Sequence, residues 1–228
     1  MPLAAPKGTR HLTKQEFVYQ TLREAILKCE LPPGERLVID DLARQLQVSA
    51  IPVREALQLL LSEGLVVNVP HVGATVAPIS RESILEVFTV MEGLEIVSTR
   101  LAAQRATEAD VQGLADVVAK MDKALAANDH EDWAELNKQF HLTIGELAHL
   151  PLLQEMMERI FDRWERVRRF YFSGVLVHRA DQAQAEHHEM LDMIRARNVE
   201  KLEAMIRRHN QGGLESYTSY FDKHPSGN

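Results

Sequence analysis

The sequence predicts a mainly α-helical protein in two parts: a small head of three helices and a hairpin, then an antiparallel all-α bundle. Apolar residues recur at helical spacing along most of the chain, and a single β-branched segment follows Gly64. Residues 1–79 carry eight basic and eight acidic residues, whereas 80–228 carry 18 basic and 25 acidic ones. The whole net charge of −7 therefore falls in the second part, which marks a boundary near Pro78.

Composition limits the class of protein. Of 228 residues, 45% are hydrophobic and 26% are charged, which is typical of a folded globular chain. No stretch of 18 apolar residues occurs and the first residues lack a long apolar segment, so we expect a cytoplasmic protein without membrane contact. Cys29 is the only cysteine, which excludes an internal disulfide and a cysteine-rich zinc site. A metal ion would have to be held by nitrogen and oxygen.

The first helix of the head is predicted to begin at a capping box, Thr13 with Glu16, and to reach about Cys29. Its inward face is predicted to carry Phe17, Leu22, Ile26 and Leu27. Two prolines and a glycine at 32–34 then break the helical pattern.

A second helix is predicted from Ile39 to Leu46, and Ser49 is predicted to cap a third that ends at Gly64. Pro52 is tolerated in the first turn of that third helix. Residues 65–79 are β-branched and punctuated by proline and glycine, which predicts a two-stranded hairpin. This order is the outline of a winged helix-turn-helix, whose third helix presents its N-terminal side chains to the DNA major groove. The neutral charge of the head gives less support for nucleic acid than a basic one would.

Residues 14–77, with the hexapeptide PVREAL at 52–57, resemble the N-terminal domain of the GntR transcription regulators. The resemblance implies contact with double-stranded operator DNA through Ser49, Ala50, Ile51 and Arg54 on the third helix and through His71 and Gly73 at the tip of the hairpin. The family usually has an arginine where Ala50 stands, and alanine reaches only a thymine methyl group, so the operator is expected to be atypical. The alternative for Arg54 is a solvated pair with Glu55 or Glu63.

Residues 80–228 are predicted to be entirely helical. Helices open after Ser80 and Thr107, and four more are predicted at about 131–148, 151–173, 179–197 and 199–221. Six helices without a sheet imply an antiparallel bundle whose binding sites lie between facing helices. We therefore expect a DNA-binding domain at 1–79 and an effector-binding and dimerisation domain at 80–228.

Four polar residues of the bundle form a candidate metal site. Asn137 and His141 are one turn apart on one predicted helix, so their side chains point to the same place. His187 and His209 lie on the last two helices and can converge on them across the bundle. His188 is predicted to be a surface residue, because adjacent helical residues point about 100° apart. Taken singly, each histidine is more often a core or surface residue than a ligand.

Residues 85–217 resemble the ligand-binding FCD domain of the FadR-type GntR regulators, with matching segments at 94–107, 137–141 and 186–191 and the late His209 in order. The resemblance implies that Asn137, His141, His187 and His209 surround zinc, nickel or manganese. An acid is common at the first of these positions. The neutral Asn137 weakens attraction for a hard cation and leaves three imidazoles suited to zinc or nickel.

Arg168 is the second candidate for binding in the bundle. It falls on an apolar helical stripe, where an unpaired charge would be costly. Its partner is predicted to be Glu95, a small carboxylate effector, or both, because Met91 stands where many relatives have an arginine for the ligand. Arg163, Arg166 and Arg169 are predicted to form a solvated basic face.

Three functions remain open from the sequence. The first is a homodimeric transcriptional regulator, expected to be a repressor, that is controlled by a small carboxylate at the metal site. The second is a metal-dependent hydrolase or oxygenase with a vestigial head, which is weakened because Asn137 cannot act as a base. The third is a dimeric metabolite-binding module.

Overall fold

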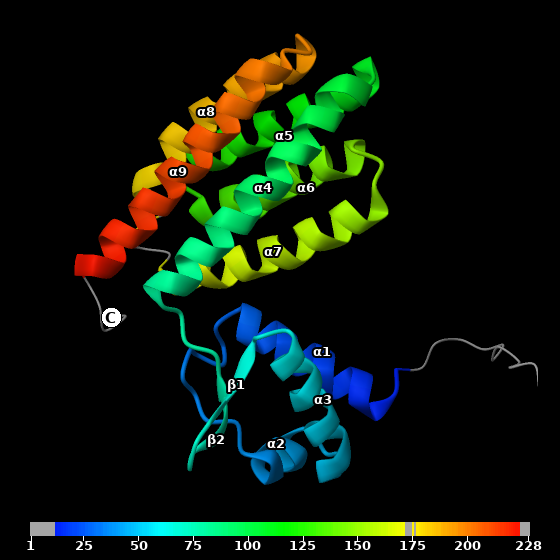
Figure 1. The fold of residues 1–228 in the computed structure, drawn as a ribbon, viewed down its shortest axis with the longest axis vertical. Helices are drawn as coiled ribbons and strands as arrows, with labels where there is room; N and C mark the ends of the chain where they lie inside the picture. The colour runs from blue at the N-terminus through cyan, green and yellow to red at the C-terminus, as the bar shows by residue number, and fades with distance from the viewer. Residues whose placement is uncertain (1–11, 172–174, 176, 224–228) are drawn as a thin grey trace, which may run out of the picture. The chain divides into compact units, whose positions relative to one another are not determined.

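The computed structural model describes residues 12–171, 175 and 177–223, and the chain divides after Pro78 into two compact units (Figure 1). The predicted fold class is confirmed, because helices dominate both units and a single two-stranded sheet is found among the described residues. None of the helices in these ranges is long and apolar enough to span a membrane.

The first unit contains three helices and the predicted hairpin. Its elements are α1 (Lys14–Leu27), α2 (Ile39–Gln45), α3 (Ala50–Ser62), β1 (Val66–Val69) and β2 (Gly73–Val76). The strands are antiparallel, with Val66 opposite Val76 and Val69 opposite Gly73. The capping box is present, since the Thr13 hydroxyl accepts from the Glu16 amide at 3.1 Å and the Glu16 carboxylate accepts from the Thr13 amide at 2.7 Å.

Two details of the head differ from the sequence-based expectation. Phe17 is 43% exposed, and Val18 instead points inward with Leu22 and Ile26, at the four-residue spacing of one helical face. Ser49 occupies the N-cap position of α3, but its side chain makes no capping hydrogen bond. Both differences leave the order of the elements unchanged.

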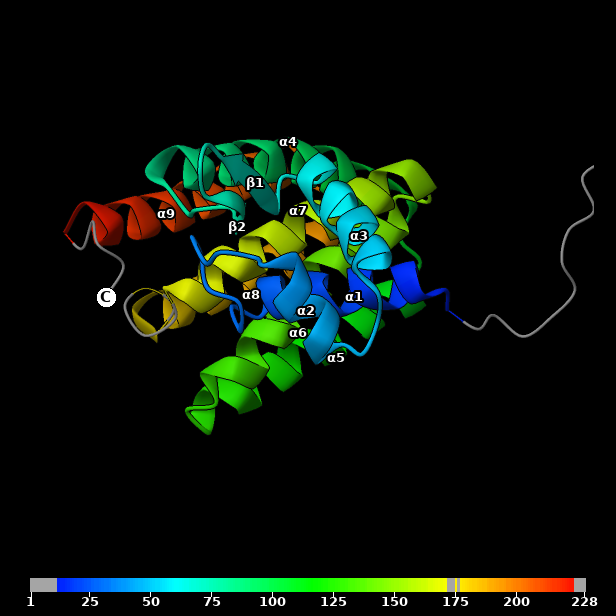
Figure 2. The same ribbon diagram turned by 90° about the horizontal axis from the view of Figure 1, so that it is seen from below.

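The second unit is a bundle of six helices over the residues that are described. They are α4 (Arg81–Arg105), α5 (Glu108–Ala126), α6 (His130–Leu147), α7 (Pro151–Phe170), α8 (Val177–Arg195) and α9 (Val199–Lys223). α4 and α9 lie side by side, α4 also packs on α6 and α7, and α5 packs on α6 and α8 (Figures 1 and 2). The six successive helices agree with the prediction from the sequence. The end of the predicted 151–173 segment, residues 172 and 173, lies outside the described residues.

The bundle has two apolar cores. One lies among α5, α6, α8, α9 and the end of α4 and includes Trp133 and Phe140. The other lies among α4, α7 and α9 and includes Phe161 and Trp164. His141 contacts both cores, because its ring lies 5.4 Å from the ring centroid of Phe140 and 5.4 Å from that of Phe161. The predicted metal-site histidine therefore lies where the two cores meet.

Candidate functional site

The bundle brings three of the predicted ligands together. His141 on α6, His187 on α8 and His209 on α9 each offer one ring nitrogen, and these atoms all lie within 4.8 Å of one another. We call these three residues the histidine cluster. Asn137 is buried and lines the cavity beside His141 and His209. His188 is exposed and contacts Asp122 at 2.9 Å, so it points away from the cluster.

Each ring of the histidine cluster has its Nδ1 atom turned to an acceptor. Nδ1 of His209 lies 2.7 Å from a carboxylate oxygen of Glu186, and Nδ1 of His187 lies 3.4 Å from the amide oxygen of Gln184. Nδ1 of His141 is in ion-pair contact with Glu95. Such partners fix the tautomer of a metal-binding histidine and leave Nε2 for the ion. Nε2 of His187 is buried and has no hydrogen-bond partner among the described residues, so the cluster fits a metal ion.

The protonation of the cluster also suits a metal ion. Burial lowers the pKa of His187 well below its usual range, and the neighbouring His209 and His141 lower it further. Burial likewise lowers the pKa of His209, although the hydrogen bond with Glu186 opposes that shift. Both rings are therefore neutral near pH 7, and the neutral imidazole is the form that binds a metal.

Two buried carboxylates lie against the histidine cluster. Burial would raise the pKa of Glu95, but His141 and a hydrogen bond of 2.6 Å from the Asn210 amide outweigh it, so the pKa is lowered. Burial would also raise the pKa of Glu186, but hydrogen bonds from His209 and Arg179 lower it to about 2. Both groups are ionised at neutral pH, which places two negative charges beside the imidazoles.

A cavity of about 60 Å³ opens beside the histidine cluster. Its polar end is formed by Glu95, Asn137, Arg179 and Asn210 together with His141 and His209, and its apolar walls include Phe88, Met91, Phe161, Trp164 and Tyr217. A single water needs about 10–15 Å³ by such a measure, so the cavity holds a few waters or a small ligand.

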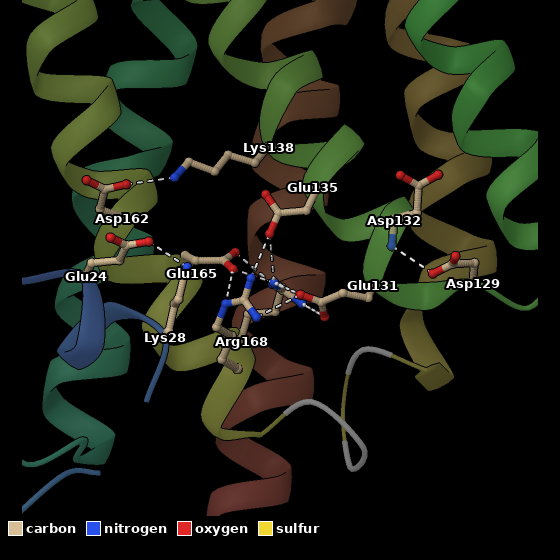
Figure 3. A network of polar contacts seen from close by, with 11 residues as sticks. Glu24, Lys28, Asp129, Glu131, Asp132, Glu135, Lys138, Asp162, Glu165 and Arg168 are labelled. Atoms are coloured by element: carbon tan, nitrogen blue, oxygen red, sulfur yellow. Dashed lines mark hydrogen bonds and ion pairs between the residues drawn. The ribbon is translucent and has the colours of Figure 1, made fainter. Parts of the chain in front are cut away.

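Arg168 is buried as predicted, with 0% exposure, but its predicted pair with Glu95 is wrong. Its guanidinium donates to Glu131 at 3.0 Å and to Glu165 at 2.8 Å (Figure 3). Glu95 instead contacts His141 and Asn210. Burial would lower the pKa of Arg168, but the two carboxylates raise it. Arg168 is also not among the residues that line the cavity.

The neighbours of Arg168 complete a second charged group, which we call the arginine cluster: Arg168, Arg169, Glu131, Glu135 and Glu165. Arg169 contacts Glu131 at 2.8 Å and Glu135 at 2.7 Å. These contacts join the first turns of α6 to the end of α7, which explains why an arginine is tolerated on an apolar stripe. The solvated face predicted for three arginines is wrong for Arg166, which is buried.

The predicted DNA contacts of the head lie on two exposed segments. On α3 and its N-cap, Ser49, Ile51 and Arg54 are exposed, with Ile51 at 67%, and Ala50 is half-buried. At the hairpin tip, His71 and Gly73 are exposed and adopt positive φ angles of 64° and 99°, which set the tight turn between β1 and β2. Glu63, a candidate partner for Arg54, instead contacts Arg23 at 3.3 Å and Tyr19.

Comparison with known proteins identifies the family. The FCD domain profile matches residues 86–212, and the profile described as bacterial regulatory proteins, gntR family, matches residues 14–76. The chain is a GntR-family transcriptional regulator with an FCD domain.

Curated relatives match this GntR regulator over most of their length. The chain is 26% identical over 191 residues to the HTH-type transcriptional regulator McbR of Escherichia coli K12, which covers 84% of this chain and 86% of McbR. It is 26% identical over 197 residues to the HTH-type transcriptional repressor GlaR of the same strain, covering 84% of this chain and 90% of GlaR. The solved structure of E. coli McbR/YncC has the same fold, with a TM-score of 0.75 at 24% identity over 92% of this chain and 100% of that chain.

The family assignment settles one of the alternatives left open by the sequence. Both matched families and the named relatives are transcriptional regulators, so the metal-dependent enzyme is set aside.

Sequence reasoning missed Arg179, the arginine that does line the cavity of this GntR regulator. Arg179 donates to Glu186 at 2.6 Å from the same helix, two turns away. A seven-residue spacing between opposite charges, next to His187, was the available signal. Arg179 also lies one turn before the buried Ala183, so helical spacing places it on the inward face of α8.

Proposed function

We propose that this GntR regulator is a cytoplasmic repressor whose affinity for a palindromic operator is set by a small carboxylate bound in the FCD domain. The observation that carries the proposal is the histidine cluster, in which three imidazoles lie together beside a cavity with both charged and apolar walls. The relative GlaR is named a transcriptional repressor, which supports the direction of control.

Asn137, His141, His187 and His209 are proposed to hold one divalent ion, with zinc or nickel favoured over manganese because the donors are mainly imidazole. An ion held by these residues would supply a fixed positive charge for a carboxylate. Glu95, Gln184 and Glu186 orient the three rings through their Nδ1 atoms. Arg168, which the sequence suggested as a ligand contact, does not line the cavity. Arg179 does line it and is proposed in its place.

Control of DNA binding is proposed to be a shift of population between two arrangements of the protein. The cavity is lined by residues of α4, α6, α7, α8 and α9, so a ligand in it contacts most of the bundle. A ligand that fits one arrangement better than the other shifts the equilibrium by that difference in affinity.

Operator titration with elemental analysis tests this proposal. Purified protein should contain about one divalent ion per chain, and a chelator should change operator affinity at fixed salt. Protein that stays metal-free after growth and repletion with zinc, nickel and manganese would overturn the metal site.

DNA reading is proposed to depend on Arg54, which is exposed on the first turns of α3 and can donate two hydrogen bonds to a guanine. Arg54→Ala should weaken specific operator binding by about 1–3 kcal/mol and leave folding nearly unchanged. Titrating the variant and the parent against one operator at fixed salt measures the difference. Arg100→Ala, at an exposed bundle arginine that pairs with Glu203, is the matched control and should bind as the parent does. Equal affinity of Arg54→Ala and the parent would remove Arg54 from the reading surface.

The regulator is also proposed to be a homodimer, since a palindromic operator has two half-sites that match a twofold axis. Leu152 and Met156 lie one turn apart on α7 and are both exposed, which suits burial against a second copy. Light scattering of the full chain at micromolar concentration should give twice the mass of 25.8 kDa. Leu152→Glu should lower it, whereas a parent that is already monomeric would contradict the dimer.

A further inference from the structure

Arg179 has one arm of its guanidinium bound and the other free for a ligand. Its Nη2 donates to Glu186 at 2.6 Å and lies 3.5 Å from the carbonyl oxygen of His209. Its Nη1 is buried and has no hydrogen-bond partner among the described residues, and the whole side chain is only 11% exposed. A buried charged donor without a partner is costly, so such an atom inside a cavity indicates the place of an acceptor.

The bundle is shaped to hold Arg179 in this position. A Cβ atom at Gly212 on α9 would lie 2.9 Å from Nη2 of Arg179, so a larger residue there would require the guanidinium to shift from its present position. At the next residue, a Cβ atom at Gly213 would lie 2.7 Å from the ring of Phe88. Two successive glycines therefore admit the charged anchor and one apolar wall of the same cavity.

The charges around the cavity limit the charge of a ligand. With the imidazoles counted in the neutral form that a metal ion requires, the carboxylates of Glu95 and Glu186 outweigh the single positive charge of Arg179. This negative balance repels an anion. A divalent ion changes the balance to one net positive charge, which one carboxylate neutralises. A dianion would leave a buried negative charge in excess, and such a charge is poorly tolerated.

The walls limit the rest of the ligand. Phe88, Met91 and Trp164 offer no hydrogen bond beyond the single indole donor, so hydroxyl groups facing them would lose their contacts with water. The cavity of about 60 Å³ excludes nucleotides and coenzyme A esters. An unbranched or aromatic hydrocarbon body of a few carbons fits both its size and its surface.

We propose that the effector is a small monocarboxylate with an apolar body, and that Nη1 of Arg179 donates to its carboxylate. This inference rests on the metal-dependent function proposed above. Beyond that function, it specifies that Arg179 anchors the ligand, that the ligand carries a single negative charge, and that the rest of the ligand is apolar.

Isothermal titration of the zinc-loaded full chain with benzoate, benzamide and succinate tests the proposal. Benzoate should bind, and benzamide, which has the same shape without the charge, should bind at least about tenfold more weakly. Succinate should also bind more weakly than benzoate. Chelated protein should lose benzoate binding, because the affinities of ion and anion are reciprocally linked. Succinate or benzamide binding as tightly as benzoate would overturn the ligand class.

The residue is tested with Arg179→Gln, which should weaken benzoate binding about 10- to 100-fold while the zinc content stays near that of the parent. Arg207→Gln is the matched control, because Arg207 is an exposed arginine of α9 that pairs with Glu92 outside the cavity. Should Arg179→Gln lose zinc, Arg179→Lys decides. It keeps a positive charge beside Glu186 but lacks the second arm, so weakened benzoate binding with zinc retained supports the anchor. Unchanged benzoate affinity in the zinc-bound variant overturns it.

The outcomes also separate this inference from the function on which it rests. If the parent binds zinc and benzoate but Arg179→Gln binds benzoate equally well, only the anchor is wrong. If zinc-loaded parent binds none of the carboxylates, the proposed effector class and the anchor both fail. If the parent holds no metal after repletion, the metal-dependent function itself fails.

Discussion

The bundle contains two groups of charged side chains, each with a buried arginine, that differ in how completely they are paired. In the arginine cluster, every charged side chain lies within 3.6 Å of an opposite charge. Beside the histidine cluster, Nε2 of His187 and Nη1 of Arg179 are buried without a hydrogen-bond partner in the described part of the chain. Buried polar groups are rarely left unpaired without a reason. Completed pairing thus indicates a structural role, and incomplete pairing indicates a ligand.

The largest effect on stability is expected from a change in the arginine cluster, in which every charge is paired. Arg168→Met should lower the free energy of unfolding by about 3 kcal/mol, because Glu165 loses the fully buried one of its two arginine partners and keeps only the more exposed Arg169. Metal content should stay at the parent level. Denaturant unfolding and elemental analysis of the same preparation measure both quantities.

Arg159→Met is the control for the arginine cluster, since Arg159 forms an exposed pair with Glu155 one turn away on the same helix. Its loss should cost no more than about 0.5 kcal/mol. Loss of the metal from Arg168→Met with the stability unchanged would reverse the roles given to the two groups.

In the histidine cluster, a substitution should change the metal content, and the stability should change as a consequence. His187→Ala should release the ion, and with it the stabilisation of about 2.7 kcal/mol that an ion at 100 times its dissociation constant provides. The test is the gain in unfolding free energy on adding zinc, which the parent should show and the variant should lack. His188→Ala should keep that gain, because His188 points to Asp122 at the surface. A gain that survives in His187→Ala would remove this ring from the ligand set.

The sequence predicted the histidine cluster better than the arginine cluster for a physical reason. The helical spacing of Asn137 and His141 determines that both point to one side of α6, and order along the chain supplies His187 and His209. The partners of Arg168 depend on where α6 crosses α7. Glu131 lies on a half-exposed first turn, where a solvated charge is the ordinary expectation.

The same distinction applies to the smaller errors. Phe17 and Val18 are both apolar, so the pattern of α1 fits a register one residue away until packing selects Val18. Arg179 depends on Gly212 of α9, and no local pattern on α8 indicates a close approach between the two helices. Local periodicity therefore predicts which residues share a face of a helix. The residues that contact this face depend on how the helices pack in the bundle.

The smallest effect on metal binding is expected from Asn137→Asp, which replaces a neutral amide ligand by a charged carboxylate of the same length. Metal affinity should hold or rise by up to about tenfold, because the carboxylate adds attraction for a cation at the same reach. Benzoate affinity should fall, since the added negative charge cancels the net positive charge left for a monoanion. Metal content by mass spectrometry and benzoate titration of the zinc-loaded variant measure the two changes. Weaker metal binding would mean that Asn137 does not face the ion. Unchanged benzoate affinity would mean that charge balance does not select the ligand.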